Sequence, residues 1–295
     1  MFDFATALAQ HDGVMSTSEL LAAGTTRHAL AAALQRGFLV RPRRGWYCLA
    51  DHRLSDAGVA RLLGGSLTCI SALAHHGIWV PSTPRIRHVR LSRHLADDWP
   101  TSPLHSKLAP TIRVHPQSKM WRTTSNSSVD APLTALLVAD QCVSSSELVA
   151  IVDSIRHHGI PLSDLEHIAD LGTASLRTAV RRSRVSESGA ESLVREWLRA
   201  AGITARTQVW VGRWRLDLVI GEWLVIEVDG FAYHSDRGPF DRDRLRDREL
   251  ALAGYTVLRI TTVDIAQRWP SVLEQIQVAM AAGWHRRPRR GAITA

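Results

Sequence analysis

The chain has 295 residues, enough for about two domains of roughly 100–200 residues each. Its hydrophobic fraction of 45% is that of an ordinary globular protein, and no apolar run reaches the ~20 residues that a membrane-spanning helix needs. The formal net charge is +8 and arginine supplies most of the positive charge, which favours an anionic partner, with DNA first. An arginine-rich proteome is the alternative explanation of this charge.

The three cysteines, Cys48, Cys69 and Cys142, are scattered and form no Cys-x-x-Cys pair. This spacing predicts neither a zinc site nor a disulfide framework, and it favours a reducing compartment. The first residues, MFDFATALAQHDG, lack the basic stretch and apolar core of a signal peptide. We therefore expect a cytoplasmic protein without a membrane partner.

Residues 2–50 are predicted to form a winged helix-turn-helix, the DNA-binding part of a first module at residues 1–80. A capping box that begins at Ser16 opens the second of three helices, and Thr25 is the predicted cap of the third. The following LVRPRRGWYCL is predicted to be a two-stranded wing with a basic tip.

Six side chains of this module are candidates for DNA contact. The third helix presents some of them opposite its apolar stripe, and the wing tip presents the others with no acid nearby, which suits phosphate. They are Arg27, His28, Gln35, Arg41, Arg43 and Arg44. A protein-docking role is the alternative, because winged helices also serve that purpose.

The segment STSELLAAGTTRHALAAALQRGFLVRPRRGWYCL and the later LTCISALAHHGIW resemble the N-terminal module of AbiEi-type antitoxins. The resemblance implies sequence-directed DNA binding and suggests autoregulation. It leaves open whether a toxin partner exists.

Residues 81–185 are predicted to be a mixed α/β middle region and linker, similar to the AbiEi middle region only weakly. The run IRHVRL at residues 86–91 predicts a strand whose basic side chains, Arg87, His88 and Arg90 among them, either extend a DNA-binding surface or form a solvated face. Amphipathic helices are predicted at residues 131–139 and 148–157.

The third segment, residues 186–284, is predicted to have the element order αβββαβ followed by a closing helix, and residues 285–295 a basic tail. The motif Ser188-x-x-Glu191 predicts a second capping box. The fold class is therefore α+β or α/β, with a winged helix-turn-helix in front of this domain.

Carboxylates interrupt two apolar strand segments of this domain, WRLDLVI and LVIEVD. A short turn pairs these strands antiparallel, so Asp217 and Glu227 approach each other, and Asp229 shares the face of Glu227. Carboxylates held close together either raise one another's pKa or bind a cation, for which Mg²⁺ is the natural choice. His234 is the candidate for proton transfer.

A purely structural alternative pairs the acids with Arg213 or Arg215. On the charged helix that follows, Arg244 and Arg248 are candidates for phosphate contact, and a solvated, salt-bridged helix face is the alternative.

The segment from residue 187 to about 265 resembles the very-short-patch-repair-type endonuclease-like domain, a branch of the PD-(D/E)xK nuclease superfamily. The matching pieces are RLDLVI, LVIEVDGFAYH, FDRDRLRDREL and AGYTVLRI. The resemblance implies that Asp217 is the metal-binding aspartate, Glu227 the second acid, His234 the histidine after the glycine, and Glu191 the helical glutamate. Asp217 and Glu227 are the predicted Mg²⁺ ligands, since paired carboxylate oxygens suit that ion.

Asp229 stands where the superfamily carries a lysine, and an aspartate cannot orient water or stabilise negative charge as a lysine does. Two hypotheses follow. In the first, the chain is a DNA-binding protein whose C-terminal domain is a Mg²⁺-dependent DNA endonuclease that hydrolyses phosphodiesters. In the second, it is a catalytically inactive, antitoxin-like transcriptional regulator that uses the nuclease fold only for binding. The sequence does not predict the oligomeric state.

Overall fold

The structure is a computed structural model that describes residues 2–51, 53–81, 86–118, 127–186, 188–229 and 237–286, with side chains from residue 244 onward in the last range. The chain divides into two compact units. The first holds Met1–Ile78, Thr83–Val143 and His167–Thr173, and the second holds Trp79–Ser82, Ser144–Glu166 and Ala174–Ala295. Across the described ranges, no helix is long and apolar enough to cross a membrane.

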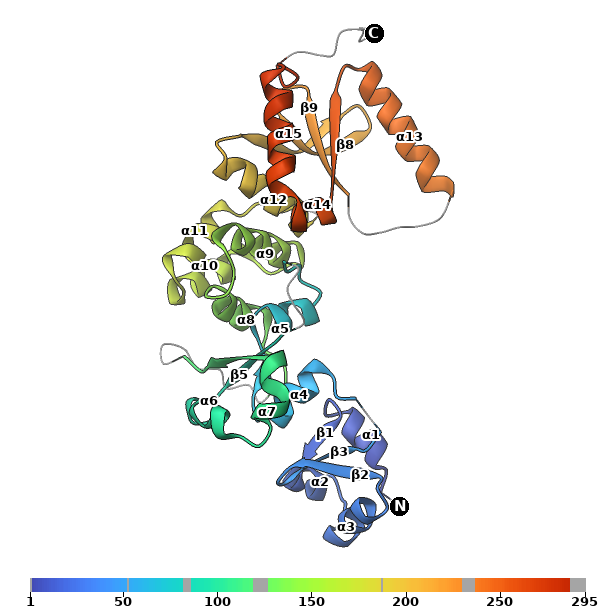
Figure 1. The fold of residues 1–295 in the computed structure, drawn as a ribbon, viewed down its shortest axis with the longest axis vertical. Helices are drawn as coiled ribbons and strands as arrows, with labels where there is room; N and C mark the ends of the chain where they lie inside the picture. Colours follow the sequence, from blue (N-terminus) through green and yellow to red (C-terminus); the bar gives the residue numbers. More distant parts are fainter. Residues whose placement is uncertain are drawn as a thin grey trace. The chain divides into compact units, whose positions relative to one another are not determined.

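The first unit begins with three helices and a three-stranded antiparallel sheet of order β1-β3-β2 (Figure 1). These elements are α1 (Phe4–Ala9), β1 (Val14–Ser16), α2 (Thr17–Ala22), α3 (Arg27–Gln35), β2 (Leu39–Arg43) and β3 (Trp46–Leu49). The capping box predicted at Ser16 is confirmed, with Glu19 closing it. The predicted cap of α3 is wrong by one residue, because Thr26 accepts the capping hydrogen bond and Thr25 is buried.

The remainder of the first unit is a second small sheet of order β4-β5-β6 with helices around it. Its β5 and β6 strands pair parallel, and β4 pairs antiparallel with β5. The elements are α4 (Asp56–Leu62), β4 (Ser66–Leu67), α5 (Cys69–His75), β5 (Arg87–Leu91), α6 (Arg93–Asp98), η1 (Trp99–Thr101), α7 (His105–Leu108), η2 (Ala109–Thr111), β6 (Ile112–Pro116) and α8 (Pro132–Ala139).

The predicted strand at residues 86–91 exists as β5. Its basic side chains were predicted to lie either on a DNA-binding surface or on a solvated face, and for two of them neither prediction is correct. His88 and Arg90 are only 5% and 8% exposed, so neither lies on a DNA-binding surface or a solvated face. Arg90 instead forms two hydrogen bonds with the Asp130 carboxylate, at 2.8 and 2.5 Å. A buried guanidinium requires such a partner, which explains why an arginine points into the core here.

The second unit contains a four-stranded sheet of order β10-β9-β8-β7, in which β10 and β9 are parallel and the other pairs antiparallel. The observed order α12, β7, β8, β9, α13, β10 is the predicted αβββαβ order. The elements are α9 (Ser145–His157), α11 (Ala174–Arg182), α12 (Gly189–Ala200), β7 (Ala205–Val211), β8 (Trp214–Ile220), β9 (Leu224–Asp229), α13 (Arg237–Leu252), β10 (Thr256–Thr261), α14 (Thr262–Gln267) and α15 (Trp269–Ala281), with α10 (Leu162–Leu171) between α9 and α11 in the chain.

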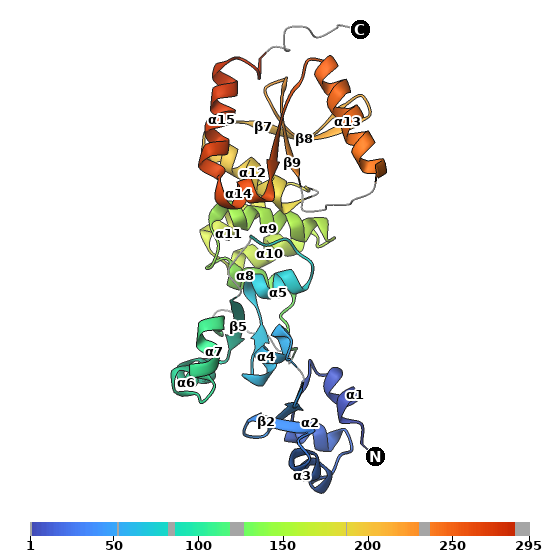
Figure 2. The same cartoon turned by 45° about the vertical axis from the view of Figure 1, so that its right-hand side comes forward.

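Helices cover both faces of this sheet, with α13 on one side and α12, α14 and α15 on the other (Figure 2). On the α12 side, Leu198 and Ile276 pack with strand residues such as Ile226. On the α13 side, Leu250 packs with Val219 and Val225. The sheet is therefore buried on both faces, and a polar side chain placed within it is withdrawn from water.

Helix α9 differs from the amphipathic helix predicted at residues 148–157. Every residue from Leu148 through Ile155 is buried, including Asp153. The Asp153 carboxylate is held by the Arg195 guanidinium at 3.0 Å and by the backbone N–H of Arg184 at 2.7 Å. The polar residues that suggested a solvated face are thus paired inside the unit.

The buried pair of Arg90 and Asp130 supplies a stability test. Asp130→Ala leaves a guanidinium buried without its carboxylate, so we expect a loss of about 3–5 kcal/mol in the free energy of unfolding. Asp56→Ala is the matched control, because Asp56 is exposed and pairs with Arg87 near the surface, and its expected cost is below about 1 kcal/mol. Urea unfolding of the full chain measures both losses in the free energy of unfolding. Equal losses in the two variants would contradict the buried pairing of Arg90 with Asp130.

Candidate active site

Asp217 and Glu227 lie on neighbouring strands near the middle of the C-terminal sheet. The β8–β9 pairing sets Leu218 opposite Ile226, and continuing this register by one residue sets Asp217 opposite Glu227. The Asp217 carboxylate accepts a hydrogen bond of 2.9 Å from the backbone N–H of Val228. The antiparallel pairing inferred from the short turn therefore does bring the two acids to the same part of the sheet.

Glu191 enters the same region from the first turn of α12. Ser188 accepts a hydrogen bond from the Glu191 backbone N–H, but the Glu191 carboxylate does not close the predicted capping box. It accepts hydrogen bonds from Gln208 Nε2 at 2.9 Å and Ser186 Oγ at 3.2 Å instead, and the residue is 7% exposed. The side chain therefore points toward the sheet rather than back along its own helix.

Gln208 is a site residue that the sequence analysis missed. The β7–β8 register pairs Thr207 with Leu218 and Val209 with Leu216, and skips the intervening Gln208 and Asp217. Gln208 has φ +55°, an uncommon left-handed conformation for a residue other than glycine. This irregularity in an edge strand places a side-chain amide on Glu191, and only the polar residue within an apolar strand could have suggested it.

The three carboxylates perturb one another. Burial, together with the negative charge of Asp217, raises the pKa of Glu191 to about 7 and that of Glu227 to about 7. Burial also raises the pKa of Asp217, and the charge of Asp229 acts in the same direction. Asp217 is thus the acid with which each of the others interacts, whereas Asp229 is exposed at the end of β9.

Arg246 of α13 offsets part of this negative charge. One of its guanidinium nitrogens lies 2.6 Å from Glu227 Oε2 and also donates to the backbone carbonyl of Arg215 at 2.8 Å. The structural alternative paired the two acids with Arg213 or Arg215, but Arg213 pairs with Glu249 and it is Arg246 that holds Glu227. Arg215 contributes to the site through its positive charge near Asp217.

The residues present fit a hard divalent cation. Glu227 Oε1 is buried and has no hydrogen-bond partner among the described residues, a costly state for a carboxylate oxygen. Within the ranges the structure describes, no three of these acids are grouped closely enough to surround an ion. Binding through one or two carboxylates, with water completing the shell, is the mode that Mg²⁺ prefers.

The other predicted site residues fall into three groups. His234 lies outside the described residues. The predicted DNA contacts that are exposed are Arg27, His28, Gln35, Arg41, Arg44, Arg244 and Arg248. Arg43 is different, because it is half-buried and its guanidinium donates to the Leu62 carbonyl at 3.1 Å.

A sequence-family model described as REase_MTES_1575 matches residues 191–280, the stretch that contains the carboxylate group. This part of the chain is therefore similar to a restriction endonuclease-like family. The match does not extend to the N-terminal residues, so the resemblance to AbiEi-type antitoxins stays a prediction. No curated protein matches the chain.

Two solved structures show weaker likeness. The homing endonuclease I-Bth0305I catalytic domain is 28% identical, with 33% of this chain and 97% of that chain covered and a TM-score of 0.29. The RV2827C protein from Mycobacterium tuberculosis is 17% identical, with 65% of this chain and 80% of that chain covered and a TM-score of 0.33. TM-scores of this size carry no conclusion about fold or function.

The raised pKa values of Glu191 and Glu227 predict how the stability of the protein depends on pH in the absence of metal. Because burial raises the pKa of Glu191 and Glu227 from 4.5 to about 7, the folded protein holds protons that the unfolded chain releases. The stability they contribute is fully present below about pH 4.5 and is lost as the pH rises through about 7. Glu191→Gln should therefore raise the free energy of unfolding at pH 8 by about 1–3 kcal/mol, and change it little at pH 4.5.

Urea unfolding in a chelating buffer at the two pH values measures this difference. Glu222→Gln is the control, because Glu222 is exposed in the turn between β8 and β9, and it should leave both values unchanged. A Glu191→Gln variant that is less stable than the unaltered protein at pH 8 would contradict this prediction. It would show that the ionised Glu191 carboxylate stabilises the fold.

Proposed function

We propose that the C-terminal domain is a divalent-cation-dependent DNA endonuclease and that Mg²⁺ is its cation. The observation that carries the proposal is a group of mutually repelling acids, the buried Glu191 and Glu227 and the half-buried Asp217, within a restriction endonuclease-like domain. Asp217 and Glu227 are the residues that would hold the cation. When bound, it stabilises charge on a phosphate and lowers the pKa of an attacking water.

The protein's own side chains have distinct tasks in this proposal. Gln208 and Ser186 hold the Glu191 carboxylate near Asp217, where a pKa of about 7 suits proton transfer at neutral pH. Arg246 fixes one oxygen of Glu227 and leaves the other available. It also supplies the positive charge that Asp229 lacks at the superfamily's lysine position. His234 remains our proposed second proton-transfer group.

We further propose that the N-terminal part of the first unit binds DNA as a winged helix. Its order of helix, strand, two helices and a hairpin supports this, as does the exposure of Arg41 and Arg44 along the hairpin. With a net charge of +8, the chain has the electrostatics of a protein that binds phosphate backbones.

A catalytically inactive regulator is the second candidate, and one observation favours it. Arg246 already neutralises one oxygen of Glu227, which reduces the need for a metal ion at that position. In this case the DNA-binding surfaces would be retained and cleavage would be absent. An antitoxin-like role, with or without a toxin partner, belongs to this second candidate.

Cleavage of supercoiled plasmid separates the two candidates. The unaltered protein should nick or linearise the plasmid with Mg²⁺ and not in a chelator, and Asp217→Asn should lower the rate by on the order of 10³-fold, because several kcal/mol of charge stabilisation are lost. The exposed Glu222 gives a matched control, and Glu222→Gln should keep the full rate. If unaltered and Asp217→Asn proteins are equally inert on double-stranded, single-stranded and mismatched DNA, the nuclease proposal fails.

DNA binding by the N-terminal hairpin is tested by its dependence on salt. Removing two phosphate contacts with the double variant Arg41→Ala, Arg44→Ala should reduce the slope of log affinity against log salt by about 2. Arg53→Ala is the control, because Arg53 is exposed but lies after the hairpin. Fluorescence anisotropy with a labelled duplex measures the slopes, and an unchanged slope in the double variant rules out this surface.

A further inference from the structure

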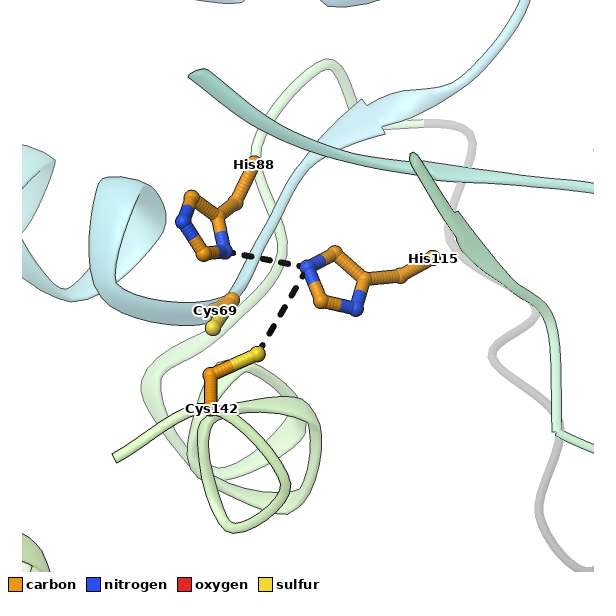
Figure 3. Close-up of side chains that lie close together, drawn as sticks. All are labelled: Cys69, His88, His115 and Cys142. Carbon is orange, nitrogen blue, oxygen red and sulfur yellow. Dashed lines mark hydrogen bonds between the residues drawn. The ribbon is translucent and has the colours of Figure 1, made fainter. Parts of the chain in front are cut away.

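Four potential metal ligands meet inside the first unit, away from the carboxylate residues in sequence. Cys69 is the first residue of α5, His88 lies in β5, His115 lies in β6, and Cys142 follows α8. Figure 3 shows the two imidazoles and the two thiols pointing toward one another from these separate elements. Each element thus contributes a single ligand.

The spacing of the ligand atoms suits one tetrahedral ion. His88 Nδ1 and His115 Nε2 are 3.0 Å apart, Cys142 Sγ is 3.9 Å from His115 Nε2, and all four ligand atoms lie within 4.8 Å of one another. Zinc bonded to nitrogen and sulfur at ordinary lengths requires about 3.3 Å between two nitrogens and about 3.6 Å between nitrogen and sulfur. The four atoms therefore need only small shifts to reach the corners of such a site.

Burial and backbone conformation also favour a built site. Cys69 is fully buried and His88 is 5% exposed, while His115 and Cys142 are half-buried. Cys69 has φ +55°, a conformation that costs a residue other than glycine free energy of order 1 kcal/mol or more. Backbone strain of this kind at the start of a helix is explained if the fold is selected to aim the thiol at the other three ligands.

We propose that Cys69, His88, His115 and Cys142 bind one structural Zn²⁺ ion. Two thiolates and two imidazoles are the donors that zinc favours over Mg²⁺, and four protein ligands leave no open position for catalysis. The ion joins α5, β5, β6 and the residue stretch after α8, so its task is to hold the second sheet of the first unit to its helices. The proposal is independent of the nuclease proposal, since the two sites share no residue.

The sequence predicted no zinc site because its three cysteines form no Cys-x-x-Cys pair. Zinc ligands usually come in close pairs, whereas here each ligand stands alone in its element. Only the folded arrangement brings them together. The absence of a Cys-x-x-Cys pair therefore does not exclude a zinc site whose four ligands come from separate elements.

Metal analysis of the full chain tests the proposal. The protein purified under reducing conditions should carry one zinc per chain by mass spectrometry, and Cys142→Ser should lower zinc affinity at least ~10-fold. Cys48→Ser is the matched control, because Cys48 is a free buried cysteine outside the group, and it should keep the zinc. Asp217→Asn should also keep the zinc, which separates this site from the carboxylates.

A second measurement on the unaltered protein avoids any dependence on how the variants fold. Metal-free protein titrated with Co²⁺ should develop thiolate-to-cobalt charge-transfer absorption and the strong visible bands of a tetrahedral ion, and Zn²⁺ should abolish both. The proposal is overturned if no such absorption appears, if Cys48→Ser removes the zinc as fully as Cys142→Ser does, or if Cys69 and Cys142 are found joined in a disulfide after reducing purification.

Discussion

The negative charge of the half-buried Asp217, close to two buried glutamates, is the constraint on which the C-terminal domain depends. The packing of α12 and α13 against the sheet buries Glu191 and Glu227 and half-buries Asp217, and the charge of Asp217 raises the cost of ionising both glutamates. Arg246 pairs with Glu227, and its positive charge also favours the ionised form of Asp217. Binding a proton or a cation lowers the repulsion between these carboxylates, so the site favours both.

The rest of the domain compensates for this local cost. Apolar residues pack on both faces of the sheet, with α12 and α15 on one side and α13 on the other. Helix α12 contributes both to the core and to the site. Leu193, Val194 and Leu198 pack in the core, and the first turn of the helix carries Glu191. The positive end of that helix also favours the ionised carboxylate. Strain and repulsion concentrated at one place, and ordinary packing elsewhere, are what functional sites commonly show.

Residue patterns were sufficient for the elements of this domain and for its acids, because strand alternation and a short turn determine which side chains meet across β8 and β9. They were insufficient for Arg246, since α13 carries many arginines and nothing in their spacing shows which one turns inward. Gln208 was missed because its position depends on an irregular strand conformation. In the first unit, Arg90 pairs with Asp130 and Cys69 lies close to Cys142. Both contacts join segments that are distant in the sequence, and the periodicity of a sequence does not predict such contacts.

The central claim, that buried acids around Asp217 form a cation site, is tested most directly by calorimetric titration of Mg²⁺ at pH 7 in two buffers of different ionisation enthalpy. Since burial raises the pKa of Glu191 and Glu227 to about 7, cation binding must displace protons from them. The account predicts binding heats that differ between the buffers by the equivalent of about one proton per Mg²⁺, and no binding to Asp217→Asn. Mg²⁺ binding that is unaffected by Asp217→Asn, or no binding to the unaltered protein, would contradict it.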